Sequence, residues 1–231
     1  MDYLLAITAI VLPVLFWSAY HLYKDRHLPE PLGNLVLCFG LGLLSFYLGK
    51  AMYLGLDLVG MRYDAFSLAE TSRVGLFAYS VLVIGVFEET AKFILFFLVV
   101  LRFKAFDEAL DGIIYASFIA LGFASLENIQ YLQFFQGPEA IARGFAGPLV
   151  HIMFASIWAY YTGVAHLEGK NALTRGIAAL ATAALLHGSY DFLVIAMPLT
   201  ALPAAAVLVL LVWLWRMRLI RDLHRAGGAD Q

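Results

Sequence analysis

Charged residues and cysteine are what this sequence of 231 residues has least of. Only 14% of its residues are charged and 62% are hydrophobic, giving a mean hydropathy of +0.82. A soluble domain has about a quarter charged residues, so this composition predicts an integral membrane protein. The single cysteine, Cys38, excludes a disulfide framework or a cysteine-ligated metal cluster within one chain. No basic stretch precedes the first apolar segment, so we expect that segment to be kept as an anchor.

Long apolar runs divide the chain into about seven predicted membrane spans. They cover approximately residues 3–23, 33–59, 74–101, 112–135, 147–166, 176–197 and 199–215. Backbone groups in lipid must be hydrogen-bonded within the protein, and long unbroken runs of this kind favour helices over barrel strands. The expected fold class is therefore all-α: a polytopic transmembrane helical bundle forming one domain over residues 1–231, with no room for a soluble domain.

Lysine and arginine residues in the predicted loops indicate the orientation of the bundle. One side holds ten: Lys24, Arg26, Arg102, Lys104, Lys170, Arg175, Arg216, Arg218, Arg221 and Arg225. The other side holds three: Arg62, Arg73 and Arg143. This asymmetry predicts an N-terminus outside and a C-terminus in the cytoplasm.

Three ionisable residues interrupt the apolar run at residues 81–100. Glu88 and Lys92 are spaced i, i+4 and Glu89 and Lys92 are spaced i, i+3, so all three lie toward one side of a helix. Each charge inside a membrane costs a few kcal/mol on insertion scales. Such a group persists where it is paired, faces a hydrated cavity or takes part in a reaction.

Five more polar residues fall inside predicted spans: Glu127, Asn128, His151, His187 and Asp191. At 1.5 Å per residue, Glu88 lies about 20 Å from the outer end of its span. Glu127, His187, Asp191 and His151 lie about 12, 15, 9 and 6 Å from theirs. The depths of these side chains predict one polar site, shared by four helices and open to the outside.

Carboxylates and imidazoles in one cavity are the groups that activate a water molecule. A desolvated carboxylate can act as a general base, and histidine can protonate a leaving group or stabilise an oxyanion. Glu127, His151 and His187 are equally candidate ligands for zinc, with a position left for water. The sequence lacks a His-Glu-x-x-His motif, and spacing alone leaves the metal-bound and metal-free versions open.

Ordered motifs over nearly the whole chain resemble those of the PrsW family of intramembrane proteases, distant relatives of the CAAX-processing membrane proteases. The motifs are Tyr23-Lys-Asp-Arg-His-Leu-Pro-Glu-Pro31, Glu88-Glu-x-x-Lys92, Asp111-Gly-Ile-Ile-Tyr115, Gly122-Phe-Ala-Ser-Leu-Glu-Asn128, the lone His151 and His187-x-x-x-Asp191.

This resemblance implies hydrolysis of a peptide bond in or near the membrane. The functional positions that it implies are Glu88, Glu89, Glu127, His151 and His187. Relatives have been described both as metalloproteases and as glutamic-type proteases, so zinc and a metal-free mechanism both stay open. The implied partner is a membrane-anchored protein of the anti-sigma-factor kind, cut in the outer half of the bilayer. The implied location is a bacterial or archaeal plasma membrane, crossed several times.

Less specific interpretations stand beside these. Glu88, Glu89 and Lys92 would also suit an ion pair that fixes helix packing, and Asp191 is expected to orient His187. Lys50 is expected to snorkel to the interface, and Trp158 to face lipid.

Two other classes of protein remain as alternatives. One is a transporter that carries protons or metal ions along the same acids and histidines, and the other is a silent membrane scaffold. Nothing in the sequence indicates nucleic-acid binding or an oligomeric state.

Overall fold

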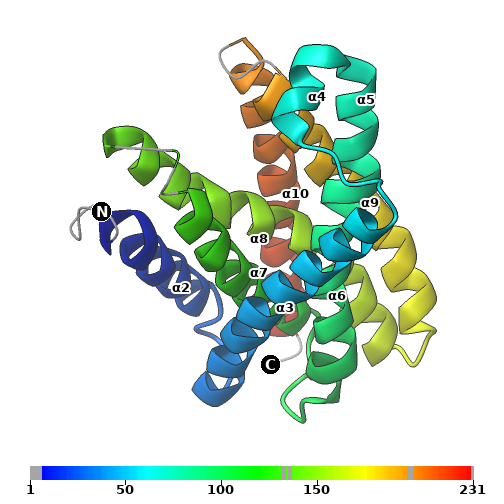
Figure 1. The fold of residues 1–231 in the computed structure, drawn as a ribbon. Coiled ribbons are helices and arrows are strands. Elements are labelled where there is room, and N and C mark those ends of the chain that lie inside the picture. The colour runs from blue at the N-terminus through cyan, green and yellow to red at the C-terminus, as the bar shows by residue number, and fades with distance from the viewer. Residues whose placement is uncertain (1–6, 132–133, 135–136, 197–199, 230–231) are drawn as a thin grey trace.

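The computed structural model describes residues 7–131, 134, 137–196 and 200–229, which contain helices and no strand. The expected all-α fold is thereby confirmed (Figure 1). The α-helices are α2 (Leu12–Lys24), α3 (Leu32–Leu58), α4 (Ala65–Thr71), α5 (Arg73–Tyr79), α6 (Val86–Val99), α7 (Ala109–Tyr131), α8 (Gly137–Leu167), α9 (Ala172–Ala196) and α10 (Leu202–Ala229). Two π-helical segments, η1 (Ile7–Val11) and η2 (Ser80–Gly85), and one 3-10 segment, η3 (Val100–Arg102), join or extend them.

Five described helices are long and apolar enough to cross a membrane, so the chain is a multi-pass membrane protein. They are α3, α7, α8, α9 and the Leu202–Leu223 part of α10. The other two predicted spans fall on helices that contain π-helical turns: η1 leads into α2, and α5, η2, α6 and η3 follow one another without a gap. The count of seven spans stays a prediction.

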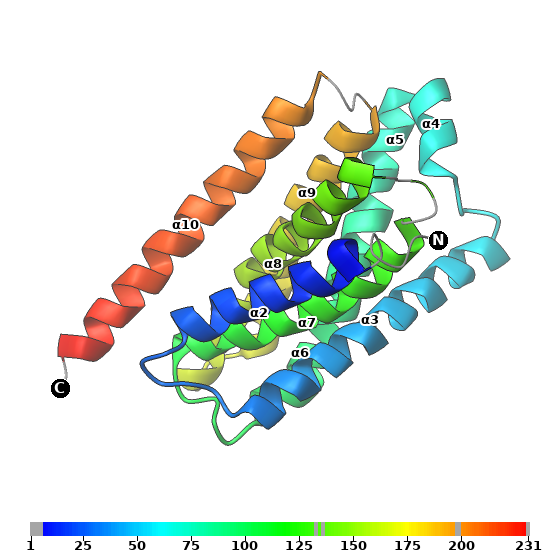
Figure 2. The same ribbon diagram turned by 90° about the vertical axis from the view of Figure 1, so that its left-hand side faces the viewer.

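Helix α7 occupies the centre of the bundle, between α3 and α8 (Figures 1 and 2). It is buried around nearly its whole circumference, which small side chains permit. Gly42 of α3 and Gly122 of α7 touch, and a Cβ on either would collide with a backbone carbonyl oxygen of the other helix. Helix α10 lies on the outside of α8 and α9 (Figure 2).

Helix α8 begins ten residues before the predicted start of the fifth span, at Gly137 rather than 147. His151 lies about 21 Å from that helix end, near the middle of α8, whereas the predicted span start placed it about 6 Å from the end of its span. The polar residues Glu139 and Arg143 suggest a loop in the sequence, but they belong to the first turns of this helix.

Four buried or half-buried carboxyl groups meet at the basic end of the bundle, the end with loops 25–31 and 103–108. Asp25 accepts a 2.8 Å hydrogen bond from the Glu30 N–H, and Tyr115 donates its hydroxyl to the Glu30 carboxylate. Asp111 accepts from the N–H groups of residues 107 and 108, at 2.8 Å each. These contacts fasten the first loop to the start of α7.

Burial raises the pKa of several of these acids. It raises the pKa of Asp25 to about 6 and that of Glu108 to about 7, and Asp111 raises both further by charge repulsion. Burial is also the main cause that raises the pKa of Glu30. The folded protein therefore holds protons at this end that the unfolded chain has already released.

We predict that the free energy of unfolding falls as the pH rises from about 4 to about 7. An acid whose folded-state pKa lies above its unfolded value binds more protons when folded, so deprotonation costs stability. Asp25→Asn keeps the acceptor oxygen for Glu30 and should flatten this fall, whereas Asp222→Asn, which changes an exposed acid, should not. Thermal unfolding in detergent across this pH range measures the slopes, and equal slopes for all three proteins would contradict the prediction.

Candidate active site

Glu88, Glu89 and Lys92 lie in the first two turns of α6, directly after the π-helical turn η2. Such turns are frequent at functional sites because they shift the register of the side chains that follow. Gly85 and Gly188 allow η2 to touch α9, since a Cβ on either would meet a backbone carbonyl oxygen of the other segment. This close contact brings the start of α6 beside His187.

Glu89 is fully buried, and both of its carboxylate oxygens have hydrogen-bond partners. One carboxylate oxygen accepts from Lys92 Nζ at 2.5 Å and lies 2.8 Å from His187 Nδ1. The other oxygen accepts from Trp158 Nε1 at 2.8 Å. Three helices thus supply polar partners to one charge, which is what makes its burial tolerable.

His151 of α8 is held by Glu127 of α7. Its Nε2 lies 2.7 Å from Glu127 Oε2, and the same oxygen lies 3.0 Å from an Arg143 nitrogen. The other ring nitrogen, Nδ1, lies 3.1 Å from Lys92 Nζ. Glu127 therefore connects two positions of α8 and fixes the orientation of the imidazole.

Glu88 differs from its neighbour because its Oε2 is buried without a hydrogen-bond partner. That oxygen lies 3.9 Å from His151 Nδ1 and 3.8 Å from His187 Nε2. Ligand atoms of these three residues all lie within 4.8 Å of one another, so the group could hold a metal ion. The outer nitrogen of each imidazole faces a carboxylate, Glu127 or Glu89, as in the carboxylate–histidine pairs that support metal ligands.

A cavity of about 620 Å³ reaches this group from the end of the bundle opposite the basic end. Glu88 and Glu127 both line it, together with aromatic residues such as Tyr53 and Tyr131. Lys50 of α3 also lines this cavity, although a merely interfacial role is expected from the sequence. Water therefore has a route to the Glu88 side chain, although Oε2 itself is buried.

Asn128 supports the site through the backbone. Pro148 lies inside α8 and has no N–H, so the carbonyl of Gly144 loses its partner from the helix. Asn128 Nδ2 donates to that carbonyl at 3.1 Å. This bond ties α7 to α8 between Glu127 and His151.

The structure brings all the predicted site residues to this one place, with two changes of partner. His187 hydrogen-bonds Glu89 rather than Asp191, whose carboxylate lies 3.7 Å from His187 Nε2. Glu88, not Glu127, completes the possible metal-binding group with the two histidines.

Sequence reasoning missed Arg143 and Trp158. Trp158 is buried and bonded to Glu89, so the expectation that it faces lipid is wrong; its spacing of seven residues from His151 indicates a shared helix face. Pro138 and Glu139, near the start of α8, carry a helix-start signal that would have placed Arg143 in the helix.

Comparisons with known proteins identify relatives over most of the chain. A family model described as PrsW family intramembrane metalloprotease matches residues 30–216. Protease PrsW of Clostridioides difficile (strain 630) is 31% identical over 209 residues, which are 88% of this chain and 84% of the relative. Protease PrsW of Bacillus subtilis (strain 168) is 31% identical over 192 residues, 83% of either chain. No solved structure matches the chain significantly.

We predict different effects on stability for the two neighbouring glutamates. Glu89→Gln leaves the buried Lys92 without its carboxylate, and breaking a buried pair costs about 3–5 kcal/mol. Glu88→Gln removes a carboxylate that has an unpartnered oxygen, and should change the free energy of unfolding by less than about 1 kcal/mol or increase it. Thermal unfolding in detergent distinguishes the two, and equal destabilisation would show that the hydrogen bonds are assigned wrongly.

A double-mutant cycle tests the bond between Asn128 and Gly144. Asn128→Ala should cost about 1–3 kcal/mol because the Gly144 carbonyl is left unpaired. Pro148→Ala supplies the missing N–H, so the same Asn128→Ala change should cost about 1 kcal/mol less in that background. Pro203→Ala, at the start of α10, is the control and should be additive with Asn128→Ala. Additivity in both cycles would contradict the role of Asn128.

Proposed function

Since the chain belongs to the PrsW family and is an intramembrane protease, we propose that it cuts a membrane-anchored protein with Glu88 at the centre of the reaction. The observation that carries this proposal is the free Oε2 of Glu88. It faces two imidazoles, and the Glu88 side chain lines the cavity. Glu89, one residue later, has no free acceptor position of this kind because it is engaged by Lys92, Trp158 and His187.

In the metal-free version of this mechanism, Glu88 is the general base. A water molecule attacks the carbonyl carbon of the scissile bond, and its proton passes to Glu88. The proton then moves to the leaving amine as the carbon–nitrogen bond breaks. His187 donates its Nε2–H to the oxyanion, which requires both ring nitrogens to be protonated; Glu89 and Asp191 flank the ring and stabilise that cation.

The donor set of Glu88, His151 and His187 also fits a divalent metal such as zinc, which would take the place of Lys92 Nζ, 3.1 Å away, as the partner of His151 Nδ1. One carboxylate and two imidazoles, with the cavity beside them, match a catalytic site that keeps a position for water. Bound zinc would acidify that water and polarise the substrate carbonyl. In this version Glu127 and Glu89 hold the two imidazoles in the orientation that directs Nδ1 of His151 and Nε2 of His187 toward Glu88.

The proposed orientation places the cavity on the outer side of the cell membrane. Ten lysine and arginine residues are assigned to the basic end, against Arg62 and Arg73 at the other, since Arg143 turns inward to Glu127. The cavity opens at the opposite end. A membrane-anchored protein of the anti-sigma-factor kind, as the sequence resemblance implies, would present its scissile bond there.

The surroundings of the site favour hydrolysis over transport of protons or metal ions. Beyond Glu89, the partners of Trp158 are the buried rings of Phe93 and Phe96, at 5.5 and 5.2 Å between ring centroids. A transported ion would have to pass this aromatic group. A hydrolytic site needs access from one end alone.

We predict that Glu88→Gln lowers cleavage of a fluorogenic transmembrane peptide in liposomes by at least about 100-fold, the contribution of a general acid–base residue. Glu139→Gln, which changes an exposed glutamate in the first turn of α8, is the matched control and should keep full activity. Thermal unfolding of both proteins shows whether a loss of cleavage comes from misfolding. Wild-type cleavage by Glu88→Gln would overturn the proposal, and ion flux that the same change abolishes would favour a transporter.

Metal analysis separates the two versions of the mechanism. In the metal version, purified wild-type protein holds zinc, which His151→Ala and His187→Ala each lose, and a chelator stops cleavage until zinc is returned. In the metal-free version, the purified protein holds no zinc and the chelator leaves cleavage unchanged, while Glu88→Gln remains inactive.

A further inference from the structure

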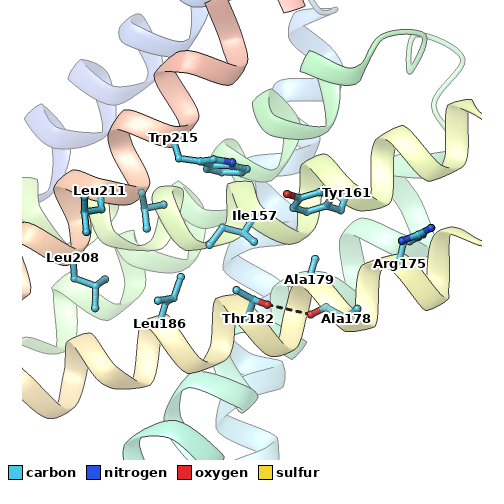
Figure 3. Close-up of a pocket in the computed structure, with 11 residues that line it drawn as sticks. Ile157, Tyr161, Arg175, Ala178, Ala179, Thr182, Leu186, Leu208, Leu211 and Trp215 are labelled. Atoms are coloured by element: carbon cyan, nitrogen blue, oxygen red, sulfur yellow. Dashed lines mark hydrogen bonds between the residues drawn. The ribbon is translucent and has the colours of Figure 1, made fainter. Parts of the chain in front are cut away.

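A second cavity, of about 590 Å³, lies between α8, α9 and α10, away from the candidate active site (Figure 3). None of the catalytic candidates lines it. Leu186 of α9 faces this cavity, whereas the next residue, His187, faces Glu89 on the other side of the helix. Helix α9 thus has the polar candidate active site on one side and this second cavity on the other.

The lining of this second cavity is apolar except near one end. Leu186, Leu208 and Leu211 form one end, and Arg175 stands at the other (Figure 3). Thr182 is satisfied within its own helix, because its hydroxyl donates to the Ala178 carbonyl at 3.4 Å. Arg175 is therefore the only charged group that the lining offers to an occupant.

Arg175 is exposed in the first turn of α9, at the basic end of the bundle. No described carboxylate lies within ion-pair distance of its guanidinium, whereas its neighbour Lys170 pairs with Glu168 at 2.7 Å. Tyr161 and Trp215 stack near the same part of the groove, with ring centroids 6.5 Å apart. Aromatic pairs of this kind favour the boundary between lipid tails and headgroups.

We propose that this groove binds one phospholipid with an anionic headgroup. The phosphate would pair with Arg175, and an acyl chain would lie along the leucine end of the groove. From Arg175 to Leu186 is eleven residues of α9, or about 16 Å. That length matches one leaflet of a hydrocarbon core about 30 Å thick, and it is too short for a substrate helix that crosses the whole bilayer.

The cavity on the opposite side of α10 provides an internal comparison. It measures about 510 Å³ and is lined by residues such as Trp17, Val209 and Trp213, with no charged side chain among them. Acyl chains suit both cavities, but only the one beside Arg175 offers a partner to an anionic headgroup. The headgroup preference is therefore assigned to the groove between α8, α9 and α10.

The test uses the full chain, purified and delipidated in detergent, and counts bound lipid by native mass spectrometry. Phosphatidylglycerol and phosphatidylcholine with identical acyl chains are titrated separately, and thermal unfolding provides a second readout because a ligand of the native state raises Tm. Inorganic phosphate alone is the control for the headgroup and should neither bind nor raise Tm. No cleavage is measured, so the result is independent of the proposed protease mechanism.

Wild-type protein should bind one phosphatidylglycerol in preference to phosphatidylcholine. Arg175→Gln should weaken phosphatidylglycerol binding about fivefold, the effect of about 1 kcal/mol per basic residue near a lipid surface. It should weaken phosphatidylcholine binding less, because the choline cation of that lipid offsets the attraction between its phosphate and Arg175. Lys170→Gln removes a charge from the same end without touching the groove and should change neither. Ala178→Phe fills the groove and should weaken both lipids.

Three outcomes would overturn the proposal. Equal binding of the two lipids by wild-type protein would remove the role of the headgroup. Equal losses in Arg175→Gln and Lys170→Gln would mean a diffuse surface charge rather than a site. A peptide or a second copy of the chain in the groove, seen as a bound mass that lipid does not displace, would identify a different occupant.

Discussion

The burial of one carboxylate, Glu89, is the constraint on which the candidate site depends. A charge in a membrane-spanning bundle is tolerated only when its hydrogen-bonding capacity is filled, and Glu89 draws its donors from α6, α8 and α9. Lys92, Trp158 and His187 are therefore fixed relative to one another by a requirement of stability. Their arrangement leaves both histidines facing Glu88.

Glu88 and Glu89 illustrate how adjacent residues of the same type acquire different roles. On a helix they point about 100° apart, so one turns into the group of donors and the other toward the cavity. Donors engage both oxygens of Glu89, and its complete burial keeps substrate and water away from it. Glu88 keeps an oxygen without a partner, which is unfavourable for stability and useful for a reaction. Glu88, with its unpartnered oxygen, is thus the better candidate for the reaction, and the hydrogen bonds of Glu89 fix the start of α6 on which Glu88 lies.

Irregularities of the backbone lie beside the site and have identifiable consequences. The π-helical turn η2 precedes Glu88, and its Gly85 allows the close contact with Gly188 of α9. Pro148 leaves the Gly144 carbonyl without its helical partner, and Asn128 donates a hydrogen bond to it. This bond joins α7 to α8 next to the Glu127–His151 pair. Regular, uninterrupted helices would need none of these contacts. Beside the site, two contacts between helices are thus made at places where the backbone hydrogen bonding is irregular.

How much the sequence could predict follows from these same interactions. The long apolar runs predict the helical fold. Ionisable residues within those runs are costly at any rotation of the helix, so their presence predicts which residues belong to the site. The hydrogen-bond partners of these residues depend on tertiary packing, which the sequence pattern does not contain. The sequence therefore predicts that Asp191 orients His187, whereas in the structure Glu89 does so. It likewise predicts that Trp158 faces lipid, whereas Trp158 donates a hydrogen bond to Glu89. Arg143 was missed for a different reason, because the polar start of α8 outweighed the helix signal of Pro138 and Glu139. Composition and depth thus locate a site, whereas the hydrogen-bond balance at each carboxylate is what separates two glutamates that are neighbours in the chain.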